Sequence, residues 1–280
     1  MFFSLERFRA IDWVLLGATV PMLALGWVTM NSFTADNYFA WRQLLWITIA
    51  IVIFFGSSQI DWNFLKRPWV LLGLYVLANV VLLSLFVVGR IKGAQSWFHV
   101  GGVSLEPGDF TNLLLIIILA KYFSRRHVEI ANIRHIIISG VYAAIPFALV
   151  LIQPNFGSAM IMACIWFGMI LVSGISKKHL LTVLGTGALA FVLLWLFIFK
   201  PYQKNRILNF VEPMRDIHGS GYNAFQSQIA VGSGRLLGKG VGYGTQSRLK
   251  FLPEYQTDFI FAAFAEEWGF VGVVLLLLCF

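Results

Sequence analysis

Residues 204–269 read KNRILNFVEPMRDIHGSGYNAFQSQIAVGSGRLLGKGVGYGTQSRLKFLPEYQTDFIFAAFAEEWG, a polar stretch punctuated by glycines in a chain that is otherwise almost wholly lipid-soluble. Everything before Lys200 reads as apolar segments joined by short loops. A basic loop of more than fifty residues, 200–256, is therefore expected on one face of a membrane. The chemistry of the protein is expected in that loop.

The composition of the chain sets its class. Of its 280 residues 59% are hydrophobic and 12% are charged, and the mean hydropathy is +0.78. Soluble domains carry about 25% charged residues, so that class is excluded. Stretches that approach the ~20 apolar residues needed to cross hydrocarbon are Ile11–Met30, Leu44–Ser57, Trp69–Gly89, Phe110–Phe123, Ile136–Ile152, Ser158–Ser173, Leu180–Phe199 and Phe259–Phe280.

These stretches predict an all-α polytopic membrane protein with about eight transmembrane helices. Flanking Trp and Tyr residues extend the shorter stretches into the interfaces. The first stretch is long and lacks a small-residue cleavage site, so it is expected to be a retained anchor. The predicted organisation is helices one to seven in 1–199, a large extracytoplasmic loop in 200–256, and helix eight in 257–280.

Lys and Arg residues in the short loops predict the orientation, because they gather on the cytoplasmic side. With a cytoplasmic N-terminus, ten of them lie inside: Arg7, Arg9, Lys66, Arg67, Lys121, Arg125, Arg126, Arg134, Lys177 and Lys178. Three lie outside: Arg42, Arg90 and Lys92. This bias places the N-terminus in the cytoplasm and the 200–256 loop on the outer face.

The loop itself is basic, with eight Lys and Arg residues against three Asp and Glu residues, a local charge of +5. A long loop does not follow the positive-inside bias, so the surplus needs another reason. One reading is an anionic partner at the outer face, since clustered cations hold phosphates. The other is attraction to lipid headgroups.

Cysteines and histidines point to no metal site. Cys164 and Cys279 lie within apolar stretches, where a thiol acts as a small hydrophobic group. The five histidines show no ligand spacing, which argues against a zinc enzyme.

The glycine run around GRLLGKG does not match a phosphate-binding P-loop. Its spacing is wrong, and no Ser or Thr follows Lys239. Glycines instead permit irregular backbone to approach protein closely. Because Leu236, Leu237, Val241 and Phe251 are interleaved with the glycines, we expect a packed segment, with a flexible loop as the alternative.

Three carboxylates lie in or beside the last apolar stretch: Asp258, Glu266 and Glu267. An ionised group in hydrocarbon costs at least about 2.5 kcal/mol unless it is paired or meets water. Adjacent residues on a helix point about 100° apart, so Glu266 and Glu267 need different neighbours. We interpret the trio, with Asp109 at another span end, as a structural or functional network. Asp12 and Asp109 can also be read as residues at water-accessible span ends.

Several motifs together resemble one family. GSGYNAFQSQIAVGSGRLLGKG at 219–240 and GTQSRLKFLPEYQTDFIFAAFAEEWGFVG at 244–272 are similar to the signature of the RodA/FtsW (SEDS) peptidoglycan glycosyltransferases of bacteria. The resemblance continues through RAIDW, GAQSWFHVGG, LEPGD, QPNFGSA and YQKNRILNFVEPMRD and covers essentially the whole chain. GTQS before the FLPE motif resembles the RodA branch more than FtsW.

The resemblance implies an enzyme of the bacterial plasma membrane that polymerises lipid II into glycan strands on the outer face, for cell elongation and shape. The 4-hydroxyl of one unit attacks the anomeric carbon that bears the polyprenyl pyrophosphate of the other. This reaction needs a base and cationic help for the departing pyrophosphate.

The resemblance also implies residue roles. It places the family's essential carboxylate at Asp216, as general base or as ligand of a divalent cation, Mg²⁺ or Mn²⁺; without it, Asp216 reads as a turn residue in a loop. Candidates to hold the pyrophosphate are Lys204, Arg206, Arg215 and Lys239. Implied partners are a class B penicillin-binding protein and elongation or division proteins, with no nucleic acid.

The chain departs from the family pattern at several positions. Ser96 stands where Arg is usual and Asn112 where Lys is usual, so two familiar cations are missing; the other departures are Glu106, Gly108, Asp109 and Ile217. The family has ten spans, so the sequence is expected to be truncated at its C-terminus, and we expect the 280-residue chain alone to be unstable or inactive. Spans beyond Phe280 would be natural neighbours of Glu266 or Glu267.

Two other functions remain open. A lipid-linked precursor flippase would also use carboxylates within the membrane. A non-catalytic scaffold of the wall-synthesis complex is favoured by the divergent LEPGD loop.

Overall fold

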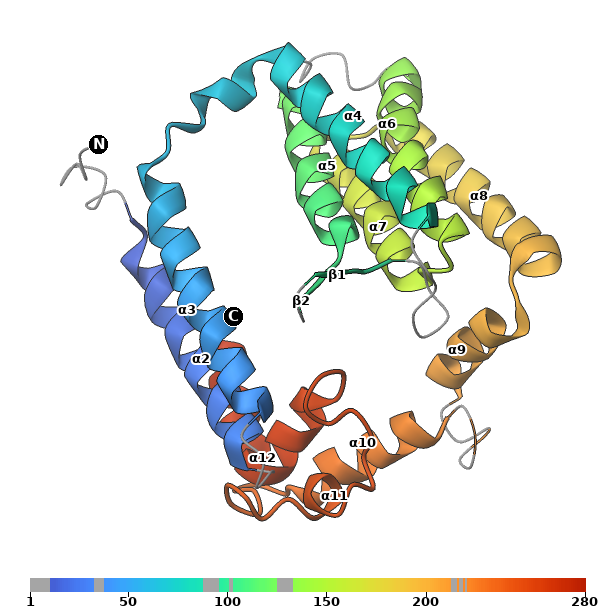
Figure 1. Cartoon of the computed structure of the whole chain (residues 1–280). Coiled ribbons are helices and arrows are strands. Elements are labelled where there is room, and N and C mark those ends of the chain that lie inside the picture. The colour runs from blue at the N-terminus through green and yellow to red at the C-terminus, as the bar shows by residue number, and fades with distance from the viewer. Residues whose placement is uncertain are drawn as a thin grey trace. The chain divides into compact units, whose positions relative to one another are not determined.

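The computed structural model describes residues 11–32, 38–87, 96–100, 103–124, 133–212, 216, 219 and 221–280 (Figure 1). Contacts divide the chain into two compact units. Unit 1 consists of residues 1–60 and 200–280, and unit 2 of residues 61–199.

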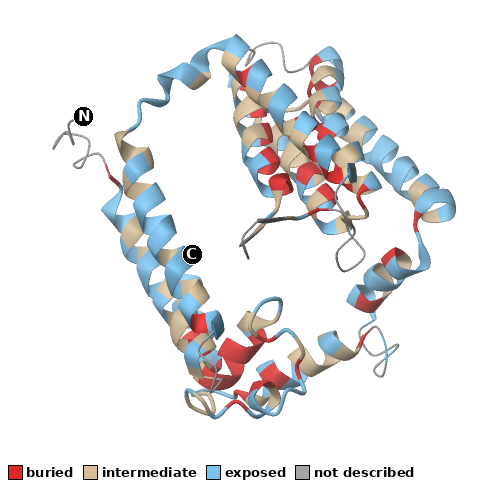
Figure 2. Cartoon of the chain, in the orientation of Figure 1, coloured by how far each residue is buried: buried red, intermediate tan, exposed pale blue. Residues whose placement is uncertain are grey.

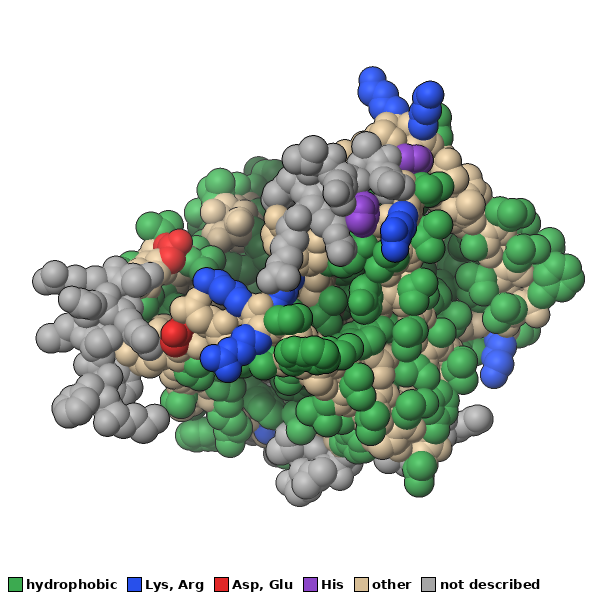
Figure 3. Space-filling model, turned by 90° about the horizontal axis from the view of Figure 1, so that it is seen from above, with side chains coloured by type: hydrophobic (Ala, Val, Ile, Leu, Met, Phe, Trp, Pro, Cys, Tyr) green, Lys and Arg blue, Asp and Glu red, His purple; other side chains and the backbone are tan. Residues whose placement is uncertain are grey.

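Helices occur at all eight predicted apolar stretches, which confirms an all-α polytopic membrane protein. Among the residues that the structure describes, six stretches of helix are long and apolar enough to cross a membrane: Trp13–Ser32, Tyr38–Gln59, Pro68–Val87, Ile133–Ile152, Lys177–Ile198 and Ile260–Cys279. Phe156–Val172 is a shorter apolar helix. The number of eight crossings stays a prediction. Figure 3 shows hydrophobic side chains over much of the described surface in that view, with Lys and Arg side chains among them.

Unit 2 is a bundle. Its elements are η1 (Trp62–Lys66), α4 (Pro68–Ser84), η2 (Leu85–Val87), β1 (Phe98–Val100), β2 (Val103–Leu105), α5 (Pro107–Ser124), α6 (Ile133–Ile152), α7 (Phe156–Val172), α8 (Lys177–Leu193) and the π-helical η3 (Leu194–Ile198). The antiparallel hairpin pairs Phe98 with Leu105. Helix α7 packs on α5 and α6, around a core that includes Leu82, Leu115 and Met162.

Side chains set where several helices of unit 2 begin. Asn155 Oδ1 accepts from the Ser158 amide at the start of α7, and Ser176 Oγ accepts from the His179 amide at the start of α8. Pro68 occupies the first turn of α4, where its missing N–H costs nothing. Such caps satisfy amides that have no partner within the helix.

Unit 1 contains α2 (Trp13–Ser32) and α3 (Tyr38–Gln59), then α9 (Pro201–Val211), α10 (Tyr222–Ser233), α11 (Thr245–Arg248) and α12 (Ile260–Cys279). Helix α12 packs on α2 and on α10. The described part of the long loop expected at 200–256 therefore includes the helices α9, α10 and α11.

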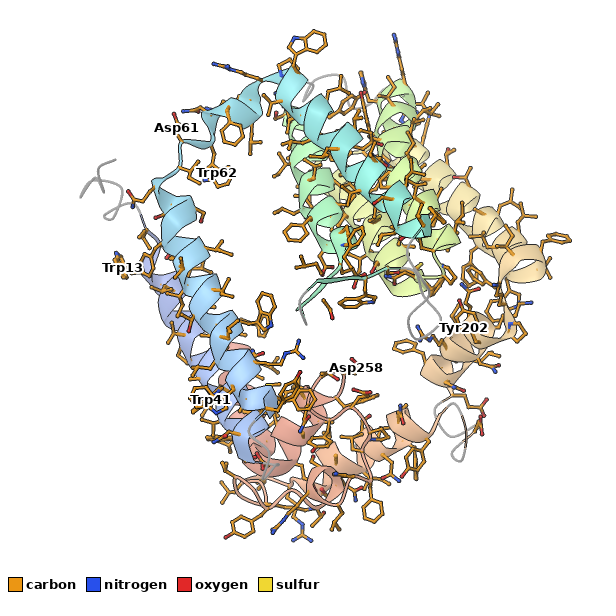
Figure 4. The ribbon with its side chains drawn as sticks, in the orientation of Figure 1. Trp13, Trp41, Asp61, Trp62, Tyr202 and Asp258 are labelled. Atoms are coloured by element: carbon orange, nitrogen blue, oxygen red, sulfur yellow. The ribbon has the colours of Figure 1, made fainter. Side chains whose placement is uncertain are left out.

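The ends of α2 and α3 carry the features of a membrane boundary. Asp12 Oδ1 accepts from the amides of Val14 and Leu15, so this carboxylate caps α2. Trp13 and Trp41 are exposed and lie toward opposite ends of the α2–α3 pair (Figure 4). Tryptophan at both ends is typical of helices that span a bilayer.

Helix α12 is interrupted at Gly269, whose φ of 67° and ψ of −170° are not helical. The buried residues of α12 lie before residue 273, and its first part is seen in red in Figure 2, whereas its C-terminal part is largely exposed and apolar. The interruption divides α12 into residues 260–268 and residues 270–279.

Candidate functional site

The glycine loop, defined here as residues 234–244 between α10 and α11, lies against the interruption in α12. It makes backbone hydrogen bonds from Lys239 N to Glu266 O (2.9 Å), Gly240 N to Glu267 O (3.0 Å), Phe270 N to Arg235 O (2.9 Å) and Val271 N to Leu236 O (3.0 Å). A break in a helix leaves amides and carbonyls without intrahelical partners. The glycine loop supplies those partners.

Glycines make this close contact sterically feasible. A Cβ at Gly238 would overlap the carbonyl of Glu267, and one at Gly234 would overlap the carbonyl of Ala265. Gly238 also has a φ of +79°, which side chains rarely adopt. The glycine loop is therefore a packed segment, as expected, but it packs through its glycine backbone. The expectation that Leu236 and Leu237 provide the packing was wrong, because both side chains are exposed.

Glu266 fixes the end of the glycine loop from within α12. Its side chain is fully buried. Its Oε1 accepts from Lys239 Nζ (2.7 Å), Thr245 N (2.9 Å), Thr245 Oγ1 (3.0 Å), Gln246 N (3.2 Å) and Ser233 Oγ (3.3 Å). The ion pair and these bonds compensate the cost of burying the carboxylate.

Glu267 faces a different set of groups. Its Oε1 accepts from Ser32 Oγ (2.8 Å) and from the amide of Gly242, so it joins the end of α2 to the glycine loop. Its Oε2 is buried and has no hydrogen bond within the described residues. Two distinct neighbourhoods for Glu266 and Glu267 are confirmed. This chain supplies hydrogen-bond partners for both carboxylates, and the expectation that spans beyond Phe280 lie beside one of them stays a prediction.

We expect Glu266→Gln to lower the free energy of unfolding by about 3 kcal/mol, since it leaves the half-buried Lys239 ammonium unpaired. Glu267→Gln should cost about 1 kcal/mol or less, because an amide oxygen can accept from the same two donors. Thermal unfolding of the purified protein in detergent measures both. Replacing Lys239 by Met in the Glu266→Gln protein should recover part of the loss; equal effects of the two single variants would contradict this account.

Asp216 stands shortly before α10 and is exposed. Its backbone carbonyl accepts from the amides of Gly219 (3.3 Å) and Gly221 (3.0 Å), which forms the turn into the helix. An alanine at Gly219 would overlap the Asp216 carboxylate. The backbone carbonyl of Asp216 thus takes part in the turn expected of a loop aspartate.

The candidate cations lie in different surroundings. Lys204 is half-buried and Arg206 is exposed, both on α9. Two positions apart on a helix is a turn of about 200°, so these side chains leave α9 on nearly opposite faces. Lys239 is 28% exposed and donates to Glu266 and Thr245. Arg215 lies outside the described residues.

The two remaining carboxylates of the proposed network are exposed. Asp258 precedes α12 (Figure 4), and Asp109 lies in the first turn of α5, where a negative charge stabilises the helix. Among the described residues, no group of three or more His, Cys, Asp or Glu side chains could hold a metal ion. A divalent cation held by Asp216 stays a prediction.

The LEPGD motif makes a contact that its sequence did not predict. Glu106 Oε1 accepts from Asn155 Nδ2 and Ser158 Oγ, both at 2.7 Å, and so ties this motif to the QPNFGSA turn. Ser96 and Asn112, the positions at which the resemblance implies cations in the family, are buried. A small neutral group costs less to bury than a charge.

Comparisons with known proteins cover nearly the whole chain. The family model FTSW_RODA_SPOVE, described as "Cell cycle protein", matches residues 5–280. The chain is 34% identical over 275 residues to the probable peptidoglycan glycosyltransferase FtsW of Nitrosococcus halophilus, which is 93% of this chain and 69% of the relative. It is 37% identical over 205 residues to the peptidoglycan glycosyltransferase MrdB of Escherichia coli K12, which is 73% of this chain and 55% of the relative.

The fold is similar to that of a chain in a solved peptidoglycan synthase complex, described as coordinating polymerization and crosslinking. The TM-score is 0.78 at 29% identity, over 96% of this chain and 75% of that chain. Relatives named FtsW and MrdB match at similar identity, so assignment to the RodA branch stays a prediction.

Proposed function

Because the chain belongs to the FtsW/RodA/SpoVE family, we propose that it is a peptidoglycan glycosyltransferase that polymerises lipid II at the outer face of the plasma membrane. The observation that carries this proposal is the similarity, over 93% of the chain, to a relative named for that activity. The packed glycine loop and the exposed Asp216 of unit 1 agree with it.

In the proposed reaction Asp216 takes the proton of the attacking 4-hydroxyl as that oxygen bonds to the anomeric carbon and the pyrophosphate leaves. An exposed carboxylate next to small residues is accessible to a sugar hydroxyl. A base within hydrogen-bond reach of the proton contributes roughly 10²–10⁴-fold to the rate.

The departing pyrophosphate needs cations. The four candidates can be ranked by their burial, by their existing partners and by their distance from Asp216 in the sequence. Lys239 already donates to Glu266, and Lys204 is half-buried. Arg206, exposed on α9, and Arg215, next to Asp216 in the sequence, are therefore the first choices. Arginine binds phosphate oxygens through paired N–H donors, which suits this role.

The proposal includes a partner and an orientation. A class B penicillin-binding protein, a transpeptidase, would crosslink the strands, as the description of the similar synthase complex suggests. Eight crossings with a cytoplasmic N-terminus would place residues 200–256 outside, where lipid II is consumed.

The direct test is polymerisation of purified lipid II in detergent by the purified protein, completed with the C-terminal spans that the resemblance implies, followed by separation of the glycan strands on a gel. A polymerase makes strands without a second compartment. A flippase or a scaffold makes no strands under these conditions. The absence of strands would therefore overturn the proposed activity.

The orientation has its own test in a variant that lacks Cys164 and Cys279. A cysteine at Glu254, which is exposed, should react with an impermeant thiol reagent in intact spheroplasts, and one at the exposed Lys177 should react only after lysis. Labelling of position 177 alone in intact cells would invert the orientation.

A further inference from the structure

Two neighbouring leucines of the glycine loop point away from the rest of unit 1. Leu236 is 68% exposed and Leu237 is 80% exposed, although both lie between two glycines, Gly234 and Gly238, that are packed against α12. The overlaps at Gly234 and Gly238 define the inner side of this segment. The leucines between them therefore lie on the outer side, where unit 1 offers them no cover.

Hydrogen bonds fix the level of these leucines along α12. The amides of Phe270 and Val271 donate to the carbonyls of Arg235 and Leu236. The leucines thus lie beside the first turn of residues 270–279, FVGVVLLLLC, which contain no charged or strongly polar side chain. Phe270 and Val271 are themselves 61% and 46% exposed.

The end of α2 provides a reference for depth. Ser32 is the last residue of α2 and is bonded to Glu267. Residues 270–271 follow Glu267 by three to four positions, across the interruption at Gly269, and belong to the part of α12 that continues beyond this level. Leu236 and Leu237 therefore lie level with the beginning of the apolar C-terminal part of α12.

We infer that Leu236 and Leu237 insert into the acyl-chain region of the bilayer and hold the glycine loop at the membrane surface. The ligand is phospholipid, because the leucines continue the exposed apolar surface of α12. Arg235 would lie at the level of the headgroup phosphates. The exposed pairs Arg248–Leu249 and Lys250–Phe251 repeat this combination of cation and apolar side chain at the other end of the loop region.

The inference goes beyond the proposed function and does not depend on it, because insertion concerns only unit 1 and the lipid. It has a consequence for a lipid-linked substrate: a segment held at the surface keeps the neighbouring α10 near the headgroup of any such molecule. Only the choice of leaflet depends on the proposed orientation.

The test is nitroxide accessibility in vesicles of phosphatidylcholine and phosphatidylglycerol, with the label on a cysteine at position 237 in the protein that lacks Cys164 and Cys279. Collisions with oxygen report the acyl region, and collisions with a water-soluble nickel chelate report water. Labels at the exposed Leu275 of α12 and the exposed Glu254 serve as lipid and water references. We expect position 237 to resemble position 275.

Two results would overturn the inference. If position 237 meets the nickel chelate as often as position 254, the leucines lie in water. If neither reagent reaches position 237 and its spectrum is immobilised, protein covers them instead of lipid.

A second variant tests insertion without a label on the leucines. With the label at the exposed Tyr243, Leu237→Asp should make the spectrum more mobile in vesicles, because the loop loses its hold on the bilayer. If the loop lay in water and not in the bilayer, Leu237→Asp would not change the mobility of the label. An unchanged spectrum in vesicles would count against insertion even if the protein folds normally.

Discussion

Asp216→Asn is expected to lower the rate of lipid II polymerisation by at least about 10²-fold, because the amide keeps the size of the side chain but cannot take a proton. Folding should survive, since the carbonyl of Asp216 accepts the amides of Gly219 and Gly221. Initial rates of glycan-strand formation, in a preparation of the protein that polymerises lipid II, measure the effect. Unchanged thermal unfolding would show that the loss is chemical.

Glu212→Gln is the matched control. Glu212 is exposed at the end of α9, four residues before Asp216, and the change removes the same charge from the same basic region. It should cost less than about threefold, because a screened surface charge contributes little. A loss as severe as that of Asp216→Asn would mean that the overall charge matters and not the position of one base.

Gly238→Ala is expected to detach the glycine loop from α12. The new Cβ would overlap the Glu267 carbonyl, and the backbone φ of +79° is unfavourable for alanine. Because the obstructing atoms are backbone, they cannot turn aside, and we expect a loss of at least about 3 kcal/mol in the free energy of unfolding. Thermal unfolding and limited proteolysis of residues 234–250 should both report it.

Gly232→Ala provides the control, at a position in α10 six residues before Gly238. No atom lies within 4 Å of a Cβ at that position. Alanine is favoured over glycine inside a helix by about 1 kcal/mol, so this variant should be as stable as the parent or slightly more stable. If both alanine variants behaved alike, close backbone contact would not be what holds the loop.

The helices could be predicted from the sequence because hydropathy alone determines them in a membrane protein. The packing of the glycine loop, in contrast, could not be predicted from the sequence. Whether Leu236 packs inward or points outward depends on which side of the backbone meets α12, and that contact lies more than 25 residues away along the chain. The interruption at Gly269 carried no signal either, since glycine is frequent in membrane helices.

Some residues of the candidate site could be predicted from the sequence and others could not. Asp216 was identified by resemblance and not by its own chemistry, because a lone loop aspartate reads as a turn residue. The need for separate partners of Glu266 and Glu267 followed from helix geometry. The identity of one partner, Ser32, could not follow, because it lies 235 residues away in sequence. The link from Glu106 to Asn155 is similarly non-local.

The interruption of α12 also constrains the order of assembly. Amides 270 and 271 and carbonyls 266 and 267 find their partners only when residues 235–240 have returned to them. The glycine loop is synthesised before α12, so its hydrogen bonds to α12 can form as soon as residue 271 has left the ribosome. Neither can complete its hydrogen bonds alone, so the loop and the two halves of α12 should open and close as one cooperative unit, with amides 239, 240, 270 and 271 exchanging with deuterium at a common rate.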